Sequence, residues 1–352
     1  MKNRNQEIIE KLQDNKSDLA GRITVLHFEK HPELEKRYGI TGRKKCYEDA
    51  IFHLDYLIEA LRMNSEKLFI HYLEWAFYML EARNVPLNDL VDNAGFIKKA
   101  IREHFPIDDM DKALEFIDAG ITHLENLKPS EETHLVPENP LLDEAREYME
   151  LLLKGKRRQA GEIIDELVKK DTPIPDIYEH IFQATQYEVG VLWQRNIITV
   201  AHEHYCTAAT QLIMSRLYPQ IFSNKKKGFK MVACSVTSEL HEIGIRMISD
   251  FFEMDGWDTY YMGSNMPDNH LIEALRENEA NLLAISVTLP IHLNKAKELI
   301  RKIKEMDEFR LLTIMAGGYP FRMIPDLYKK IGADTTAATA RQAIEAANRL
   351  VN

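Results

Sequence analysis

A glutamate and a histidine two residues apart lie in one short polar turn, and these residue types together suit a metal site. The turn follows the apolar run Val232–Val236 and contains Glu239 and His241, before Gly244 opens an amphipathic helix. A histidine in the loop after a strand of an α/β unit stands at the carboxyl edge of the sheet, where such sheets bind ligands. A single loop histidine is more often a solvated or capping residue, so the other loops must decide.

Two later loops carry small or polar residues at equivalent places. Ser286 and Thr288 end the apolar run that begins at Leu282, and Gly317 and Gly318 end the run that begins at Leu311. Glycines let the backbone approach a ligand closely, and hydroxyl groups offer hydrogen bonds to its polar parts. The three loops together therefore predict one ligand site at the carboxyl edge of a parallel sheet.

The pattern Glu239-x-His241-x-x-Gly244 resembles the Asp/Glu-x-His-x-x-Gly motif of cobalamin-binding domains, and the order of the three loops is similar too. The resemblance implies that His241 is the lower axial ligand of cobalt and that Glu239 orients its imidazole ring. It also implies that five residues contact the nucleotide tail of the cofactor: Gly244, Ser286, Thr288, Gly317 and Gly318.

A second pattern lies upstream, where Trp193 ends one helical run and Thr199 is placed to cap the next, so that Glu203 and His204 fall in its first turns. The Trp-x9-Glu-His spacing resembles that of CarH-type photoreceptors. In that family the Trp and Glu lie over the upper face of the corrin and enclose the adenosyl group. One departure is Gln194, which stands where CarH has a histidine that captures cobalt after photolysis.

This second resemblance implies a light-sensing protein that binds adenosylcobalamin and is not an enzyme. Photolysis of the Co–C bond would repack the helical bundle and change the oligomeric state, or the binding of a signalling partner. The alternative is a corrinoid methyl-carrier subunit of a methyltransferase system. A methyl carrier must open its upper face to a partner enzyme, so dedicated upper residues such as Trp193 and Glu203 favour the photoreceptor.

The elements that position these residues change in character along the chain. We expect an all-helical domain with a globin-like pocket, a linker, an up-down four-helix bundle, and a flavodoxin-like doubly wound sheet of five parallel strands. The expected strands are 229–236, 257–262, 282–287, 311–315 and 333–335, and one expected helix covers 320–331. The expected boundaries of the four parts are 1–126, 127–139, 140–219 and 228–352.

The N-terminal domain resembles the helical module of photocobilins, which pair cobalamin with biliverdin, in segments such as Leu68–Trp75. That resemblance makes His53 and Asp55 candidates for a bilin site, because they lie on the helix with the most aromatic neighbours. Cys46 could form a thioether, although a lone cysteine is more often a small core residue. The competing interpretation is a dimerisation or partner-docking domain without a ligand.

The bulk composition excludes several classes of protein. The net charge of -10 argues against a nucleic-acid partner, because phosphate binding needs a basic surface. The three cysteines are far apart and form no C-x-x-C pair, which indicates a reducing compartment. No apolar signal core and no apolar stretch long enough for a bilayer is present. We therefore expect a cytoplasmic protein without a membrane partner.

Overall fold

The computed structural model describes residues 4–128, 133–222 and 224–351, and the chain divides into two compact units, Met1–Pro129 and Ser130–Asn352. Among the described residues, no helix combines the length and the apolar character that crossing a membrane requires.

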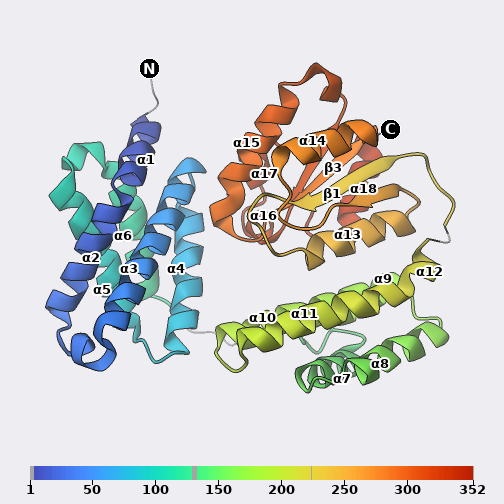
Figure 1. The fold of residues 1–352 in the computed structure, drawn as a ribbon, viewed down its shortest axis with the longest axis horizontal. Coiled ribbons are helices and arrows are strands. Elements are labelled where there is room, and N and C mark those ends of the chain that lie inside the picture. Colours follow the sequence, from blue (N-terminus) through green and yellow to red (C-terminus); the bar gives the residue numbers. More distant parts are fainter. Residues whose placement is uncertain (1–3, 129–132, 223, 352) are drawn as a thin grey trace. The chain divides into compact units, whose positions relative to one another are not determined.

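The first unit is helical throughout its described part (Figure 1). Prolines precede α3, α5 and the 3₁₀ turn Ile107–Asp109, where a missing backbone N–H does no harm. Its six α-helices are α1 (Arg4–Asp14), α2 (Lys16–Lys30), α3 (Glu33–Arg62), α4 (Glu66–Glu81), α5 (Leu87–His104) and α6 (Asp111–Glu125). Helix α2 packs against α3 and α5, and α4 packs against α6. Gly39, with φ 56° and ψ -152°, kinks α3.

The second unit begins with a helical layer, which we call the cap (residues 142–221). It contains α7 (Leu142–Leu153), α8 (Arg157–Lys169) and a rod made of α9 (Ile174–Ile177), the π-helical turn Tyr178–Gln183 and α10 (Ala184–Gln194). A last rod contains α11 (Val200–Met214), the 3₁₀ turn Ser215–Leu217 and α12 (Tyr218–Ile221). The apolar core of the cap continues into the sheet domain, because Tyr178 packs edge-on against Phe251 with ring centroids 5.9 Å apart.

Beyond the cap lies a parallel sheet with helices on both faces (Figure 1). The strands β1 (Lys230–Ser235), β2 (Asp258–Tyr261), β3 (Leu282–Ser286) and β4 (Thr313–Gly317) are hydrogen-bonded in the order β2-β1-β3-β4. On one face, α13 (Ile243–Met254) and α18 (Ala340–Leu350) bury apolar side chains of both helices against the strands. The other helices are α14 (Asp268–Glu277), α15 (Leu293–Lys304), α16 (Tyr319–Met323) and α17 (Leu327–Ile331).

Two details of this sheet domain differ from the sequence prediction. Within the described residues, the predicted fifth strand is reduced to a single bridge between Met315 and Thr335, so the sheet has four strands. The helix predicted over 320–331 is divided into α16 and α17 around Pro325, because proline disfavours helical backbone at the residue before it. Neither difference alters the loops at the carboxyl ends of β1, β3 and β4.

Candidate functional site

The candidate site lies where the strand order reverses, between β1 and β3. Connections from two such strands run to opposite faces of the sheet and leave a crevice at their carboxyl ends. The register places Ser235 of β1 beside Ser286 of β3, and Ser286 beside Gly317 of β4. The three loops that the sequence predicts to share one site therefore start side by side.

Glu239 is fully buried in this crevice and joins the loop after β1 to the loop after β3. Its Oε1 accepts hydrogen bonds from the backbone N–H of His241 at 3.1 Å and from His241 Nδ1 at 2.5 Å. Its Oε2 accepts from the backbone N–H groups of Thr288 (2.8 Å) and Leu289 (2.9 Å), and from His292 Nδ1 (3.2 Å). Burial opposes ionisation, but these hydrogen bonds outweigh it and hold the pKa of Glu239 well below its usual range.

His241 is thereby held in one orientation. An ionised Glu239 can only accept hydrogen bonds, so the neutral imidazole carries its proton on Nδ1 and leaves the Nε2 lone pair free for a metal. Ser235 Oγ donates to the backbone carbonyl of His241 at 2.8 Å and fixes the turn. The side chain of His241 is 54% exposed, so the free nitrogen can reach a ligand outside the protein core.

The cap brings a second carboxylate toward this imidazole. The hydrogen bond from Glu239 raises the pKa of His241 against the effect of burial, and the charge of Glu203 raises it further. Glu203 lies in the first turn of α11, which Thr199 caps, and Trp193 lies in the last turn of α10. His204 is exposed and its Nδ1 is 2.5 Å from Glu203 Oε2. Glu203 is therefore near enough to His241 for its charge to favour the protonated imidazole.

Glu203 is also the outer end of a polar chain inside the cap. Thr207 Oγ1 lies 3.3 Å from Glu203 Oε1 and 3.0 Å from Gln186 Oε1. The amide nitrogen of Gln186 donates to Thr210 Oγ1 at 3.0 Å, and Thr210 also bonds to the buried hydroxyl of Tyr148. These hydrogen bonds hold the face of α11 that carries Glu203 against α10 and α7.

The glycines predicted to contact a nucleotide tail fall into two kinds. A Cβ atom added at Gly244 or Gly317 would meet no atom within 4 Å, so both positions border open space. Gly318 has φ 114° and ψ -178°, and its Cβ would lie 2.0 Å from the carbonyl oxygen of Val287. The free imidazole nitrogen and the open backbone at Gly244 and Gly317 together suit a corrinoid with an extended tail.

Two of the predicted tail contacts have a structural part in the site. Ser286 ends β3 and is 8% exposed, and the backbone N–H of Thr288 is used by Glu239. His292 was not predicted from the sequence, although it follows Thr288-Leu289-Pro290-Ile291 in the same loop. Its position after a strand was the only signal that could have suggested it.

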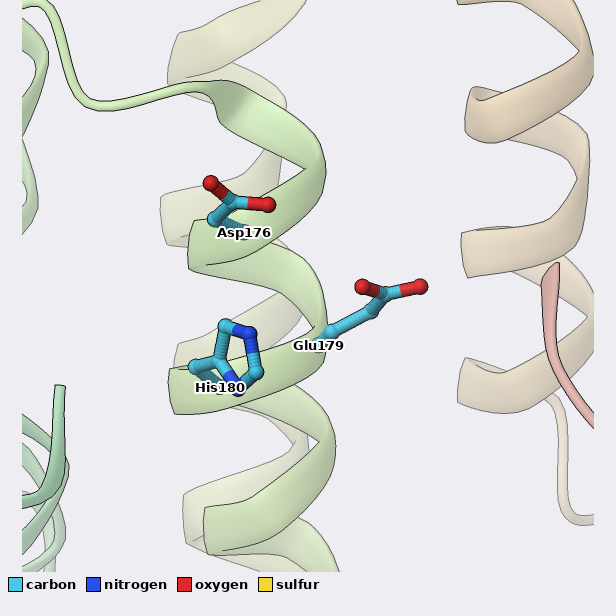
Figure 2. Close-up of side chains that lie close together, drawn as sticks. All are labelled: Asp176, Glu179 and His180. Atoms are coloured by element: carbon cyan, nitrogen blue, oxygen red, sulfur yellow. The ribbon is translucent and has the colours of Figure 1, made fainter. Parts of the chain in front are cut away.

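A separate cluster of Asp176, Glu179 and His180 has the residue types of a metal site, but two of its members already bind a cation. Figure 2 shows the three side chains on neighbouring turns of the cap rod. Asp176 Oδ1 lies 2.7 Å from Arg341 Nη2, and Glu179 Oε2 lies 3.0 Å from Arg341 Nε. The cluster therefore fastens the cap to α18 of the sheet domain. Tyr178 makes a second link, since its hydroxyl donates to Asp250 of α13 at 2.8 Å.

Comparison with known proteins indicates the class to which the cap and the sheet domain belong. Residues 229–348 match a family model described as a B12 binding domain, and residues 144–218 match a second model with the same description. These matches support a cobalamin, with its cobalt, as the cofactor of the second unit.

Individual relatives are corrinoid proteins. The chain is 23% identical over 206 residues to dimethylamine corrinoid protein 3 of Methanosarcina acetivorans (58% of this chain, 95% of the relative). It is 24% identical over 218 residues to a corrinoid protein of Desulfitobacterium hafniense (60% of this chain, 97% of the relative). The solved structure of the monomethylamine corrinoid protein of Methanosarcina barkeri shares the fold, with a TM-score of 0.54 at 19% identity, over 60% of this chain and 99% of that one.

These relatives correct the prediction of a CarH-type photoreceptor, which is wrong. They are corrinoid proteins, two of the three named for methylamines, and they support neither a photoreceptor nor light-dependent assembly. The Trp193 to Glu203 spacing misled because it reflects the end of α10 and the start of α11, and two helix ends do not specify a ligand. The expectation that the chain itself is not an enzyme agrees with the names of the relatives.

The prediction of biliverdin as a second chromophore is wrong on the same ground. The two residues proposed for it have partners within the first unit. His53 is buried with its Nδ1 2.8 Å from the hydroxyl of Tyr72, and Asp55 lies 2.5 Å from the ammonium group of Lys16. The aromatic residues around them pack on one another, as Tyr56 and Tyr72 do with ring centroids 3.7 Å apart.

Proposed function

We propose that the chain is a corrinoid carrier of a methyltransferase system, with cobalamin held between the cap and the sheet domain. The observation that carries the proposal is the His241 imidazole, fixed by a buried carboxylate with its Nε2 free, inside two segments that match B12 binding domains. The names of the relatives support the carrier role. As part of the same proposal, residues 140–219 cover the upper face of the corrin and residues 228–352 hold its lower face and tail.

When bound, the cobalamin supplies a cobalt atom that can accept a methyl group and give it up. In this proposal His241 Nε2 would hold the cobalt, and Glu239 would keep the proton on Nδ1 so that the Nε2 lone pair is available. Gly244 and Gly317 leave room for the tail, which Ser286 and Thr288 flank. The links at Arg341 and Asp250 hold one end of the cap, so the opposite side with Trp193 and Glu203 is where a partner methyltransferase would gain access.

The experiment starts with the full chain reconstituted with methylcobalamin in the dark and freed of unbound cofactor. We expect a bound corrinoid whose absorption lacks the contribution of its own base as ligand, and loss of the methyl ligand when extract of the native host and a thiol acceptor are added. The variant His241→Ala should bind less cofactor or bind it without a protein ligand. A chain that retains no corrinoid contradicts the proposal, as does a methyl ligand that no extract removes.

The same measurement with adenosylcobalamin tests which upper ligand the cap accepts. Tighter retention of the adenosyl form than of the methyl form would contradict a methyl carrier. The variant Trp193→Ala should affect the two forms alike if the indole only covers the corrin, and a selective loss of the adenosyl form would indicate a pocket for that group.

A further inference from the structure

His292 is a buried histidine that the predicted site does not include. It lies at the end of the 3₁₀ turn Pro290–His292, directly before α15, and only 7% of it is exposed. Its Nδ1 is 3.2 Å from Glu239 Oε2. The same oxygen already accepts from two backbone N–H groups, which can only donate, so Oε2 acts as an acceptor and His292 Nδ1 is placed to donate to it.

The two oxygens of Glu239 have separate tasks. Oε1 accepts from His241, whereas Oε2 accepts only from the loop after β3, through the N–H groups of Thr288 and Leu289 and the imidazole of His292. Among the described residues, His292 is the one side chain that donates to Oε2. Since rotation of the carboxylate would break all three bonds to that loop, the same bonds fix the direction in which Oε1 faces His241.

We propose that His292 is a positioning residue for the cobalt ligand, holding the carboxylate of Glu239 so that it orients His241 across the crevice. This rests on the proposed function, in which His241 ligates cobalt. The relay connects loops from two different strands, so the orientation of the ligand depends on the loop after β3 as well as on its own loop. Partners of this outer kind commonly change metal affinity by about 10–100-fold when removed.

The test uses the full chain uniformly labelled with ¹⁵N, reconstituted with unlabelled hydroxocobalamin and reduced to the Co(II) state. In electron paramagnetic resonance, a ¹⁵N imidazole from the protein splits the cobalt lines into doublets, and the cofactor's own ¹⁴N base splits them into triplets. We expect doublets for the wild-type chain. Triplets, or no bound cofactor, would overturn the proposed function and the role of His292 with it.

Two variants separate the role of His292 from that of filling space. His292→Leu fills the volume without a donor and should weaken hydroxocobalamin binding about tenfold and reduce the doublet fraction. His292→Asn places an amide N–H where Nδ1 stands and should recover most of both. The exposed His270, on α14, gives the matched control His270→Leu, which should change neither. Wild-type affinity and full doublets in His292→Leu would overturn the inference and leave the proposed function intact.

A measurement on the wild-type apoprotein decides the matter if His292→Leu does not fold. The ¹⁵N chemical shifts of a histidine ring report which nitrogen carries the proton. We expect both His241 and His292 to be protonated on Nδ1. A His292 ring that is neutral and protonated on Nε2 could not donate to Glu239 and would refute the relay.

Discussion

Two adjacent glycines in the loop after β4 should respond differently to the same substitution. At Gly317 an added Cβ meets no atom within 4 Å, whereas at Gly318 it would lie 2.0 Å from the carbonyl oxygen and 2.7 Å from the carbonyl carbon of Val287. Gly318 also has φ 114° and ψ -178°, a conformation that is open essentially to glycine alone. Val287 cannot retreat easily, because its backbone N–H donates to the carbonyl of Gly317 at 2.9 Å.

The structure sets the size of each effect. Forcing alanine into the backbone conformation of Gly318 costs about 1–3 kcal/mol, and the contact with Val287 adds to it, so Gly318→Ala should lower the free energy of unfolding by about 3 kcal/mol. For a unit of this size that lowers the melting temperature by roughly 6–12 °C. Gly317→Ala should stay within about 0.5 kcal/mol of the wild type, because its methyl group enters open space. That space is where we place the cofactor's tail, so this variant should bind cobalamin at least about tenfold more weakly.

The assay combines thermal unfolding of both apoproteins, followed by far-UV circular dichroism, with titration of each by hydroxocobalamin. Hydrogen exchange of peptides from β3 and β4 locates the loss of stability within the sheet domain. A Gly318→Ala chain as stable as the wild type would refute the reasoning about the Val287 contact. A Gly317→Ala chain with normal stability and normal affinity would place the tail elsewhere.

Three further substitutions test the effect of two buried ionisable groups and one ion pair on stability. Burial raises the pKa of Asp250 from 3.8 to about 6, so the folded state loses stability as pH rises from about 4 through 6. The variant Asp250→Asn can still accept the hydrogen bond from Tyr178 and should be more stable than the wild type above pH 6, by up to about 3 kcal/mol. Denaturant unfolding at pH 5 and pH 8 measures this difference. Burial lowers the pKa of His53 from 6.5 to about 4, so the free energy of unfolding of the first unit should fall by up to about 3 kcal/mol as pH falls from 6.5 to 4. In melting curves recorded across this pH range, His53→Gln should reduce the dependence of stability on pH. Arg341→Ala breaks a half-exposed ion pair and should lower the free energy of unfolding, measured with denaturant, by no more than about 1 kcal/mol. A decrease above about 3 kcal/mol would mean that the stability of the cap depends on this ion pair.

Apolar periodicity predicts most of the elements but not their exact limits. The strand predicted to start at Leu311 begins two residues later, because pairing of Thr313 with Leu282 sets the register and leaves Leu311 86% exposed. The apolar spacing over 176–193 is that of one helix, whereas the structure has a π-helical turn at Tyr178–Gln183 between α9 and α10. The strand predicted at 333–335 is not formed, because in the described residues this segment makes a single β-bridge to β4, at Thr335.

In the site, contacts between residues close in sequence could be predicted, whereas contacts between separate loops could not. Glu239 and His241 form their hydrogen bond across two residues of one turn, so spacing alone predicts the pair. His292 reaches Glu239 from another loop, and only the order of the strands brings the two together. The spacing of Trp193 and Glu203 misled the functional prediction for a related reason, since it describes two helix ends and does not specify a ligand.

The buried carboxylate of Glu239 has one more consequence for how a cofactor would enter. All five of its hydrogen bonds come from groups of the protein itself, so the fold alone can orient the imidazole. Affinity then need not be spent on ordering the ligand ring, and capture of a corrinoid should be limited by how readily its own base dissociates from the metal.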